Sequence, residues 1–201
     1  MPRAFSRIAY TPAVRRTQER YGSRATNERF EMDPNARDRI GAHDAAFIER
    51  IDTFFMSSVG ENGWPYVQHR GGPRGFLKVL DERTVGFADF AGNRQYISAG
   101  NLSADGRVML ILMDFATRGR MKLWGRARIV HADDDPALLA RLDLPGYSAR
   151  VERAYVIEVE ALDLNCPQHI TQRFSAQELV EMASTPDGRA YLAALLGPAL
   201  Q

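Results

Sequence analysis

The densest group of residues able to bind a small charged ligand lies between Gln68 and Gly75. Within it, Arg70 and Arg74 stand among three glycines. Glycines let a backbone approach a ligand closely and aim successive amides at an anion, and arginines supply the paired donors that phosphate prefers. The alternative interpretation is a solvated hairpin loop with incidental arginines, and this stretch alone leaves both open.

A second group, at residues 89–96, favours the phosphate interpretation. A predicted strand ends at Asp89 and Phe90, and a short predicted helix begins at about Asn93. A helix N-terminus carries unpaired amides and partial positive charge, so it is a natural phosphate site. Arg94 places a positive charge at the positive end of the helix dipole, which is unfavourable unless an anion sits beside it. The alternative is an N-cap asparagine with a surface arginine.

A third group occupies alternate positions of a predicted strand. Alternate side chains on a strand share one face, so this face is a basic stripe interrupted by an indole. Such a stripe can line a pocket for a phosphorylated aromatic cofactor, bind single-stranded nucleic acid, or be a solvated sheet face. With a formal net charge of +1 for the whole chain, nucleic acid ranks last. The residues are Arg118, Arg120, Lys122, Trp124, Arg126 and Arg128.

Cys166 and His169 invite two further hypotheses, a nucleophilic pair or a metal site shared with His69 and His131. A thiol must be activated by a positioned base, and residues three apart just after a strand seldom achieve this unaided. Metal sites usually show tighter paired spacings. We therefore predict no metal site, and we assign no catalytic residue.

Composition limits the classes of protein that fit. The chain has 201 residues, of which 45% are hydrophobic and 25% charged, as in a folded globular protein of one domain. One cysteine excludes an internal disulfide and fits a reducing compartment. The sequence has no apolar run of about 20 residues and no signal-peptide core near Met1. We predict a cytoplasmic protein that binds neither a membrane nor nucleic acid.

The secondary structure predicted to position these groups changes along the chain, from helices at both ends to strands in the middle. In residues 1–50, cap and stop signals predict helices at 11–22, at 33–41 and from Asp44 onward. They are expected to wrap a neighbouring surface, with a second subunit as one candidate. Residues 164–201 also read as helical, with a capping box from Ser175 to Glu178 and a helix start at Thr185.

Between these ends, residues 52–163 follow the two-residue period of strands. A short helix is predicted at about 93–103, and residues 132–151 are predicted to be a short acidic linker. Helices between most strands are missing, so a small antiparallel barrel fits better than a parallel sheet. We predict a single domain, 1–201, with a mainly β fold and α extensions: a 52–163 core between the helical segments 1–50 and 164–201. The predicted strands cover residues 54–59, 64–68, 76–80, 84–90, 107–115, 120–131 and 154–162.

The order and spacing of these motifs over about residues 45–165 resemble the pyridoxamine 5'-phosphate oxidase-related flavin-binding family. The resemblance rests on the loop at 68–72, the strand and turn at 86–96 and the strand segment at 122–127. It implies a split β-barrel that holds flavin mononucleotide (FMN) at the interface of a homodimer. Residues 165–173 depart from the C-terminal signature of the authentic oxidase, and the 132–151 linker replaces its substrate-binding insert. The oxidase's own substrate therefore does not carry over.

The resemblance also implies roles for individual residues. Arg70 and Arg94 are expected to hold the flavin phosphate, with Gln95 in a position often held by lysine. Lys122 and Trp124 are expected to reach the site from the partner subunit, and the segment after the last strand is expected to fold over the flavin. The full set of cofactor-binding residues is Gln68, His69, Arg70, Gly71, Asp89, Phe90, Asn93, Arg94, Gln95, Lys122, Trp124 and Gln168.

Two functions follow from this resemblance. The first is an FMN-dependent oxidoreductase that acts on an unidentified small molecule. The second is a non-catalytic module that binds flavin or haem on the same barrel for sensing, storage or delivery. Fold alone does not choose between them.

Overall fold

The structure is a computed structural model that describes residues 3–165 and 167–197. These residues divide into two compact units, which are described separately. The larger unit contains residues 3–113 and 120–165, and the smaller contains 114–119 and 167–197.

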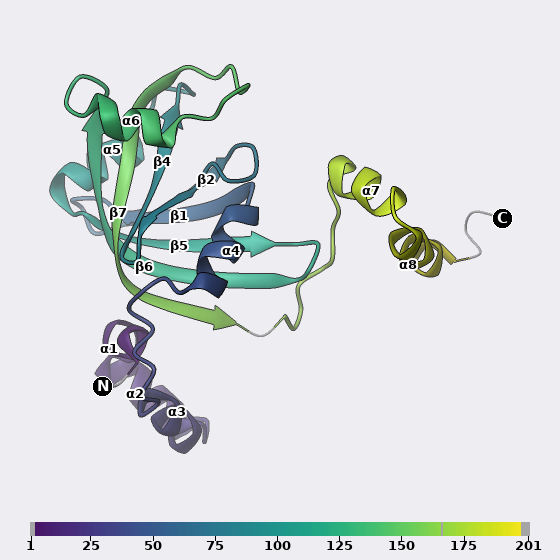
Figure 1. Cartoon of the computed structure of the whole chain (residues 1–201). Helices are drawn as coiled ribbons and strands as arrows, with labels where there is room; N and C mark the ends of the chain where they lie inside the picture. The colour runs from purple at the N-terminus through teal and green to yellow at the C-terminus, as the bar shows by residue number, and fades with distance from the viewer. Residues whose placement is uncertain (1–2, 166, 198–201) are drawn as a thin grey trace. The chain divides into compact units, whose positions relative to one another are not determined.

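One sheet dominates the described part of the chain, with the strand order β2-β1-β5-β6-β7-β4-β3 (Figure 1). The pairs β1–β2, β1–β5, β3–β4, β4–β7 and β6–β7 are all antiparallel. This confirms the predicted mainly β fold with helices at both ends. The strands are β1 (Thr53–Val59), β2 (Pro65–Gly71), β3 (Lys78–Asp81), β4 (Thr84–Phe90), β5 (Arg107–Asp114), β6 (Gly119–His131) and β7 (Val151–Asn165).

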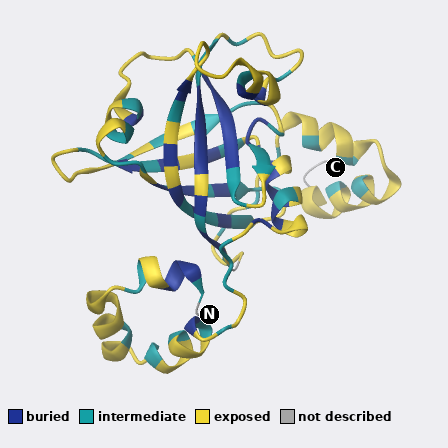
Figure 2. Ribbon diagram, turned by 60° about the vertical axis from the view of Figure 1, so that its left-hand side comes forward, coloured by how far each residue is buried: buried dark blue, intermediate teal, exposed yellow. Residues whose placement is uncertain are grey.

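Alternation along the strands builds the core, which Figure 2 shows as buried positions along the sheet. In β1, Phe54 and Met56 are fully buried while Phe55 between them is exposed. Phe54 stacks on Phe76 with ring centroids 5.4 Å apart, and Phe87 stacks on Tyr155 at 5.0 Å. Burying these rings drives the sheet to curl around them.

The helices begin largely where the capping signals predict. The Thr11 hydroxyl accepts a hydrogen bond from the Val14 amide at 3.3 Å, and Ser175 and Glu178 form the predicted capping box. In the described residues the helices are α1 (Ala4–Ala9), α2 (Pro12–Arg20), α3 (Arg24–Glu31), α4 (Ala42–Arg50), α5 (Ile97–Ala104), α6 (Pro136–Leu142), α7 (Ala176–Ala183) and α8 (Pro186–Leu196).

One predicted helix, at residues 33–41, is wrong. The Asp33 carboxylate accepts the Asn35 amide at 2.8 Å and a hydrogen bond from Arg3 at 2.6 Å, so it closes a turn instead of capping a helix. Arg37 then adopts a left-handed φ of 53°, which interrupts any helix. The helix lies earlier, at α3, where Glu31 forms ion pairs with Arg24 of the same helix and with Arg15 of α2.

The linker predicted at 132–151 also contains more structure than expected, because α6 lies within it. The Asp135 carboxylate caps α6 by accepting the Leu138 amide at 2.9 Å. Leu138 and Leu142 are buried against Ala88 of β4 and Val156 of β7, and this packing stabilises a helix that is too short to be stable on its own.

The first N-terminal helix, α1, packs against the sheet of its own chain. Phe5 of α1 is buried beside Trp124 of β6 and Ala161 of β7, with the Phe5 and Trp124 rings 6.0 Å apart. None of the described helices is long and apolar enough to span a bilayer.

Candidate cofactor site

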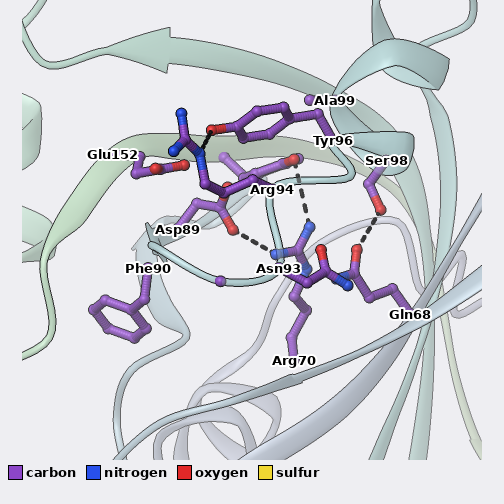
Figure 3. A pocket seen from close by; sticks show the side chains of 12 residues that line it. Gln68, Arg70, Asp89, Phe90, Asn93, Arg94, Tyr96, Ser98, Ala99 and Glu152 are labelled. Carbon is purple, nitrogen blue, oxygen red and sulfur yellow. Dashed lines mark hydrogen bonds and ion pairs between the residues drawn. The ribbon is translucent and has the colours of Figure 1, made fainter.

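A solvent-open cleft with about 350 Å³ of empty space lies beside the end of β4 and the start of α5 (Figure 3). Side chains from β2, β4, β7 and the β4–α5 connection line it. The lining residues are Gln68, Arg70, Asp89, Phe90, Gly92, Asn93, Arg94, Tyr96, Ser98, Ala99, Glu152 and Tyr155.

A β-bulge on β7 shapes one wall of the cleft. Asp89 is paired with Arg153 and Phe90 with Val151, so Glu152 is an extra residue without a partner on β4. A bulge re-aims the side chains around it. Here Glu152 lines the cleft and forms an ion pair with Arg153.

The opposite wall is an unusual turn that leads into α5. Arg94 and Tyr96 both adopt left-handed backbone conformations, with φ of 61° and 53°, which non-glycine residues seldom do. The Asn93 side chain accepts the Gln95 amide at 3.1 Å within the same turn. Strained residues of this kind cluster at ligand-binding sites.

This turn leaves the first turn of α5 without a side-chain cap. Tyr96 is the N-cap residue and makes no capping hydrogen bond through its side chain. Ser98 and Ala99, in the first turn of α5, line the cleft. An uncapped helix start that faces a cleft offers amides and partial positive charge to an anion.

Asp89 is the electrostatic centre of the site. Its side chain is buried and forms ion pairs with Arg70 of β2 and, at 3.3 Å, with Arg153 of β7. Burial raises the pKa of Asp89 above its usual value, while the two arginines oppose that shift. The Arg153 guanidinium also lies 4.7 Å from the Tyr96 ring centre, which ties the strained turn to β7.

Arg70 is held from several sides but keeps unused hydrogen-bonding capacity. One terminal nitrogen pairs with Asp89, and the other donates to the Tyr155 hydroxyl at 3.4 Å. Its Nε is buried and has no hydrogen-bond partner among the described residues. Burial, with the nearby Asp89 charge, raises the pKa of Tyr155, so its hydroxyl stays neutral.

Arg94 differs from the other arginines of the cleft because it is exposed and forms no ion pair with a described carboxylate. Its Nε donates a long hydrogen bond, of 3.4 Å, to the Tyr96 hydroxyl. Arg70 and Arg94 line the cleft together with Asp89 and Glu152, and Arg153, which does not line it, pairs with both carboxylates. With Arg153 counted, the site carries a net charge of about +1 before any ligand binds.

A second pocket shares Arg70, Asp89 and Phe90 with the cleft and has aromatic walls. Its empty volume is about 390 Å³. The His69 imidazole at its edge is 2.6 Å from the Thr53 hydroxyl. The lining residues are His69, Arg70, Gly71, Phe76, Phe87, Ala88, Asp89 and Phe90.

The structure therefore brings together most of the residues predicted from the sequence. Eight of the twelve line the cleft or the neighbouring pocket: Gln68, His69, Arg70, Gly71, Asp89, Phe90, Asn93 and Arg94.

The other four predicted residues line neither space. Gln95 lies in the strained turn, and Lys122 and Trp124 lie on β6, where Trp124 contacts Phe5. Gln168 is exposed in the smaller unit. Cys166, from the rejected nucleophile hypothesis, lies outside the described residues.

Sequence reasoning missed six of the residues that line the cleft. Glu152 and Tyr155 were missed because the predicted strand began at 154 and strand alternation carries no sign of a bulge. Residues 96–99 were placed inside the predicted helix, whereas α5 begins only at Ile97. The missed residues are Gly92, Tyr96, Ser98, Ala99, Glu152 and Tyr155.

Comparison with solved structures finds similar chains at low sequence identity. An FMN-binding protein from Syntrophomonas wolfei is 14% identical, with 73% of this chain and 97% of that chain covered and a TM-score of 0.47. A putative pyridoxamine 5'-phosphate oxidase from Lactobacillus delbrueckii is 18% identical (63% and 94% covered, TM-score 0.46). A HupZ variant from Group A Streptococcus is 14% identical (63% and 99% covered, TM-score 0.46).

Among curated proteins, none is similar enough to this chain to count as a match. The sequence profile of the family described as pyridoxamine 5'-phosphate oxidase, in contrast, matches residues 40–163, which is more than half of the chain and contains the whole cleft. The chain belongs to the pyridoxamine 5'-phosphate oxidase family.

Proposed function

We propose that this protein binds FMN and works as an FMN-dependent oxidoreductase on a small molecule, as a homodimer with the cofactor at the subunit interface. One observation carries the proposal: a positively charged cleft combines Arg70 and Arg94 with the uncapped start of α5. Family membership adds that relatives commonly bind FMN.

The residues of the cleft fit a phosphate group. Arg94 offers a guanidinium without a carboxylate partner among the described residues, and the buried Nε of Arg70 is a donor without an acceptor. The first amides of α5 supply further donors at the positive end of the helix dipole. Arginine donors and helix amides together make a strong site for a phosphate monoester.

The neighbouring pocket fits the aromatic part of the same ligand. Phe76, Phe87 and Phe90 give it apolar walls, and it shares the residues Arg70, Asp89 and Phe90 with the cleft. Bound FMN would supply the redox chemistry, while the residues of this chain bind and orient it.

The outer face of the sheet supports a homodimer. We define this face by Phe55, Val67, Met109 and Ile111, which lie on adjacent strands in matching register. Phe55 is 39% exposed and Val67 is 60% exposed. Ser57 and His69 lie on the same face, opposite Val67 and Phe55 respectively. Exposed apolar side chains grouped on one sheet face favour a protein–protein interface.

In such a dimer the remaining predicted residues would act across the interface. Lys122 is half-buried on β6 and is the stronger candidate for contacting the partner's flavin. Trp124 packs against Phe5, so its contribution requires that contact to coexist with the flavin or to rearrange. Gln168 would act from the C-terminal segment.

The absorption spectrum of the purified protein tests the proposal. Flavin bands, and recovery of these bands when FMN is added back after extraction, support it. A protein that ignores added FMN contradicts it, and a Soret band would point to a haem-binding module instead. Bleaching of the flavin by a reduced nicotinamide under anaerobic conditions would separate an oxidoreductase from a flavin-binding module.

The Arg94→Ala variant tests the location of the phosphate. It should weaken FMN binding by about 2 kcal/mol, measured by quenching of flavin fluorescence. Arg29→Ala removes an exposed arginine of α3 and serves as the matched control. An equal FMN affinity in both variants would place the phosphate elsewhere.

A further inference from the structure

We propose that the cleft binds a phosphate monoester together with one proton, shared between Asp89 and the phosphate, and that it therefore selects phosphate over sulfate. This inference rests on the proposed function in one respect, namely that the cleft is the site of the FMN phosphate.

The charges at the cleft supply the first step. Arg70 of β2, Asp89 of β4, Arg94 of the connection to α5 and Glu152 of β7 line it. Arg153 of β7 is not a lining residue, but it pairs with both carboxylates. Burial raises the pKa of Tyr155, so this side chain adds no charge. A phosphate dianion added to this net charge of about +1 leaves one uncompensated negative charge, and one proton restores balance.

The position of Asp89 supplies the second step. Its carboxylate lines the cleft, yet it cannot turn away, because one oxygen is paired with Arg70 and the other lies 3.3 Å from Arg153. A phosphate that recruits the free capacity of Arg70 therefore approaches an acceptor that is already fixed there. Two acceptors in contact need a proton between them.

The burial of Asp89 supplies the third step. The residue is only 7% exposed, so water cannot compensate an additional negative charge beside it. Its raised pKa, which is caused by burial, shows that protonation is already easier here than in water. The second ionisation of a phosphate monoester lies near pH 6, so the proton is available close to neutral pH.

Sulfate lacks this possibility. A sulfate dianion has the shape and charge of phosphate but holds no proton near neutral pH, so its oxygens would meet the Asp89 carboxylate directly. The same groups that accept phosphate therefore reject sulfate.

His69 is the nearby group whose own protonation could also produce proton uptake on binding. It lines the neighbouring pocket next to Arg70 and bonds to Thr53. Because histidines exchange protons near neutral pH, His69→Gln is the matched control for any proton measurement.

Titration calorimetry of the full chain in two buffers with different ionisation heats counts the protons directly. At about pH 7.5, where the phosphate of free FMN has lost its second proton, FMN should take up close to one proton per site, whereas riboflavin, which lacks the phosphate, should take up none. Asp89→Asn should bind FMN without this proton, and His69→Gln should keep it. Wild-type binding without proton uptake, or the same uptake in Asp89→Asn, would overturn the proposal.

Inorganic anions test the proposal even if this protein does not bind FMN. Phosphate should protect the protein against thermal unfolding, or displace FMN, at about one-tenth of the concentration at which sulfate does so. Equal potency of the two anions on the wild-type protein would contradict the proposal, even where Asp89→Asn fails to fold. Phosphate selectivity without FMN binding would leave the proton-coupled site intact and refute the flavin proposal alone.

Discussion

Asp89 and Arg153 face each other as register partners on β4 and β7, and the Asp89 carboxylate lies 3.3 Å from the Arg153 Nε. This pair joins the two strands just where the bulge at Glu152 begins. Through the stacking of Arg153 on Tyr96, it also connects the sheet to the strained turn before α5. The geometry of the cleft thus depends on an ion pair between adjacent strands.

Arg153→Gln should therefore destabilise the protein by about 1–3 kcal/mol, because a buried carboxylate loses one of its two cationic partners. Urea denaturation measures the change. Arg126→Gln breaks an exposed ion pair with Glu160 and should cost less than about 1 kcal/mol. Equal losses in the two variants would show that the Asp89 pair has no special role.

Val67→Asp should disrupt the proposed dimer, since it puts a charge on the exposed apolar face that Val67 shares with Phe55. Light scattering after gel filtration should report a monomer, with a far-UV spectrum like that of the wild type. FMN affinity should fall with it if the cofactor lies at the interface. Val14→Asp, on the exposed part of α2, is the control and should leave the oligomeric state unchanged.

The Asp105 carboxyl group should titrate at an unusually low pH. Hydrogen bonds from the Arg107 side chain, and then from its backbone amide, lower the pKa of Asp105 from 3.8 to about 2. A lowered carboxyl pKa stabilises the fold above pH 3.8, and this contribution disappears as the pH falls toward about 2. NMR titration should show this midpoint in the wild type. In Arg107→Gln it should move up toward 3.8, and an unchanged midpoint would contradict the assignment.

Two glycine substitutions should have opposite effects on stability. A Cβ at Gly125 would lie 2.3 Å from the Glu158 carbonyl oxygen, so Gly125→Ala should destabilise the protein by about 1–3 kcal/mol. Gly100 lies in α5 with nothing within 4 Å of such a Cβ, and Gly100→Ala should stabilise it by about 0.4–1 kcal/mol. Thermal unfolding compares the two. Stabilisation by Gly125→Ala would show that the strands can separate there.

Local signals predicted much of this fold. The capping side chains of Thr11 and Ser175 act within one helical turn, and strand alternation such as that around Phe54 depends on a single sheet face. Such signals survive in the sequence because their causes lie only a few residues away. Asp33 shows the limit, since a distant partner, Arg3, turned a helix-capping residue into part of a turn.

The sequence predicted the site residues that lie at the ends of strands, and only some of the site residues elsewhere. Arg70 and Arg94 could be found because basic residues beside glycines or a helix start suggest an anion. Glu152 and Tyr96 could not, since one depends on a bulge and the other on a left-handed backbone, and neither has a sequence pattern. Their positions follow from tertiary contacts between strands far apart in the chain.

The left-handed turn at Arg94 and Tyr96 has a consequence for the speed of binding. The chain itself holds this turn, through the Asn93 side chain on the Gln95 amide and the Arg153 guanidinium on the Tyr96 ring. No loop then has to fold around an arriving anion, so its capture needs no slow rearrangement and is limited by the frequency of productive collisions. Residence time, set by how fast the anion departs, would then be the quantity that distinguishes one ligand from another.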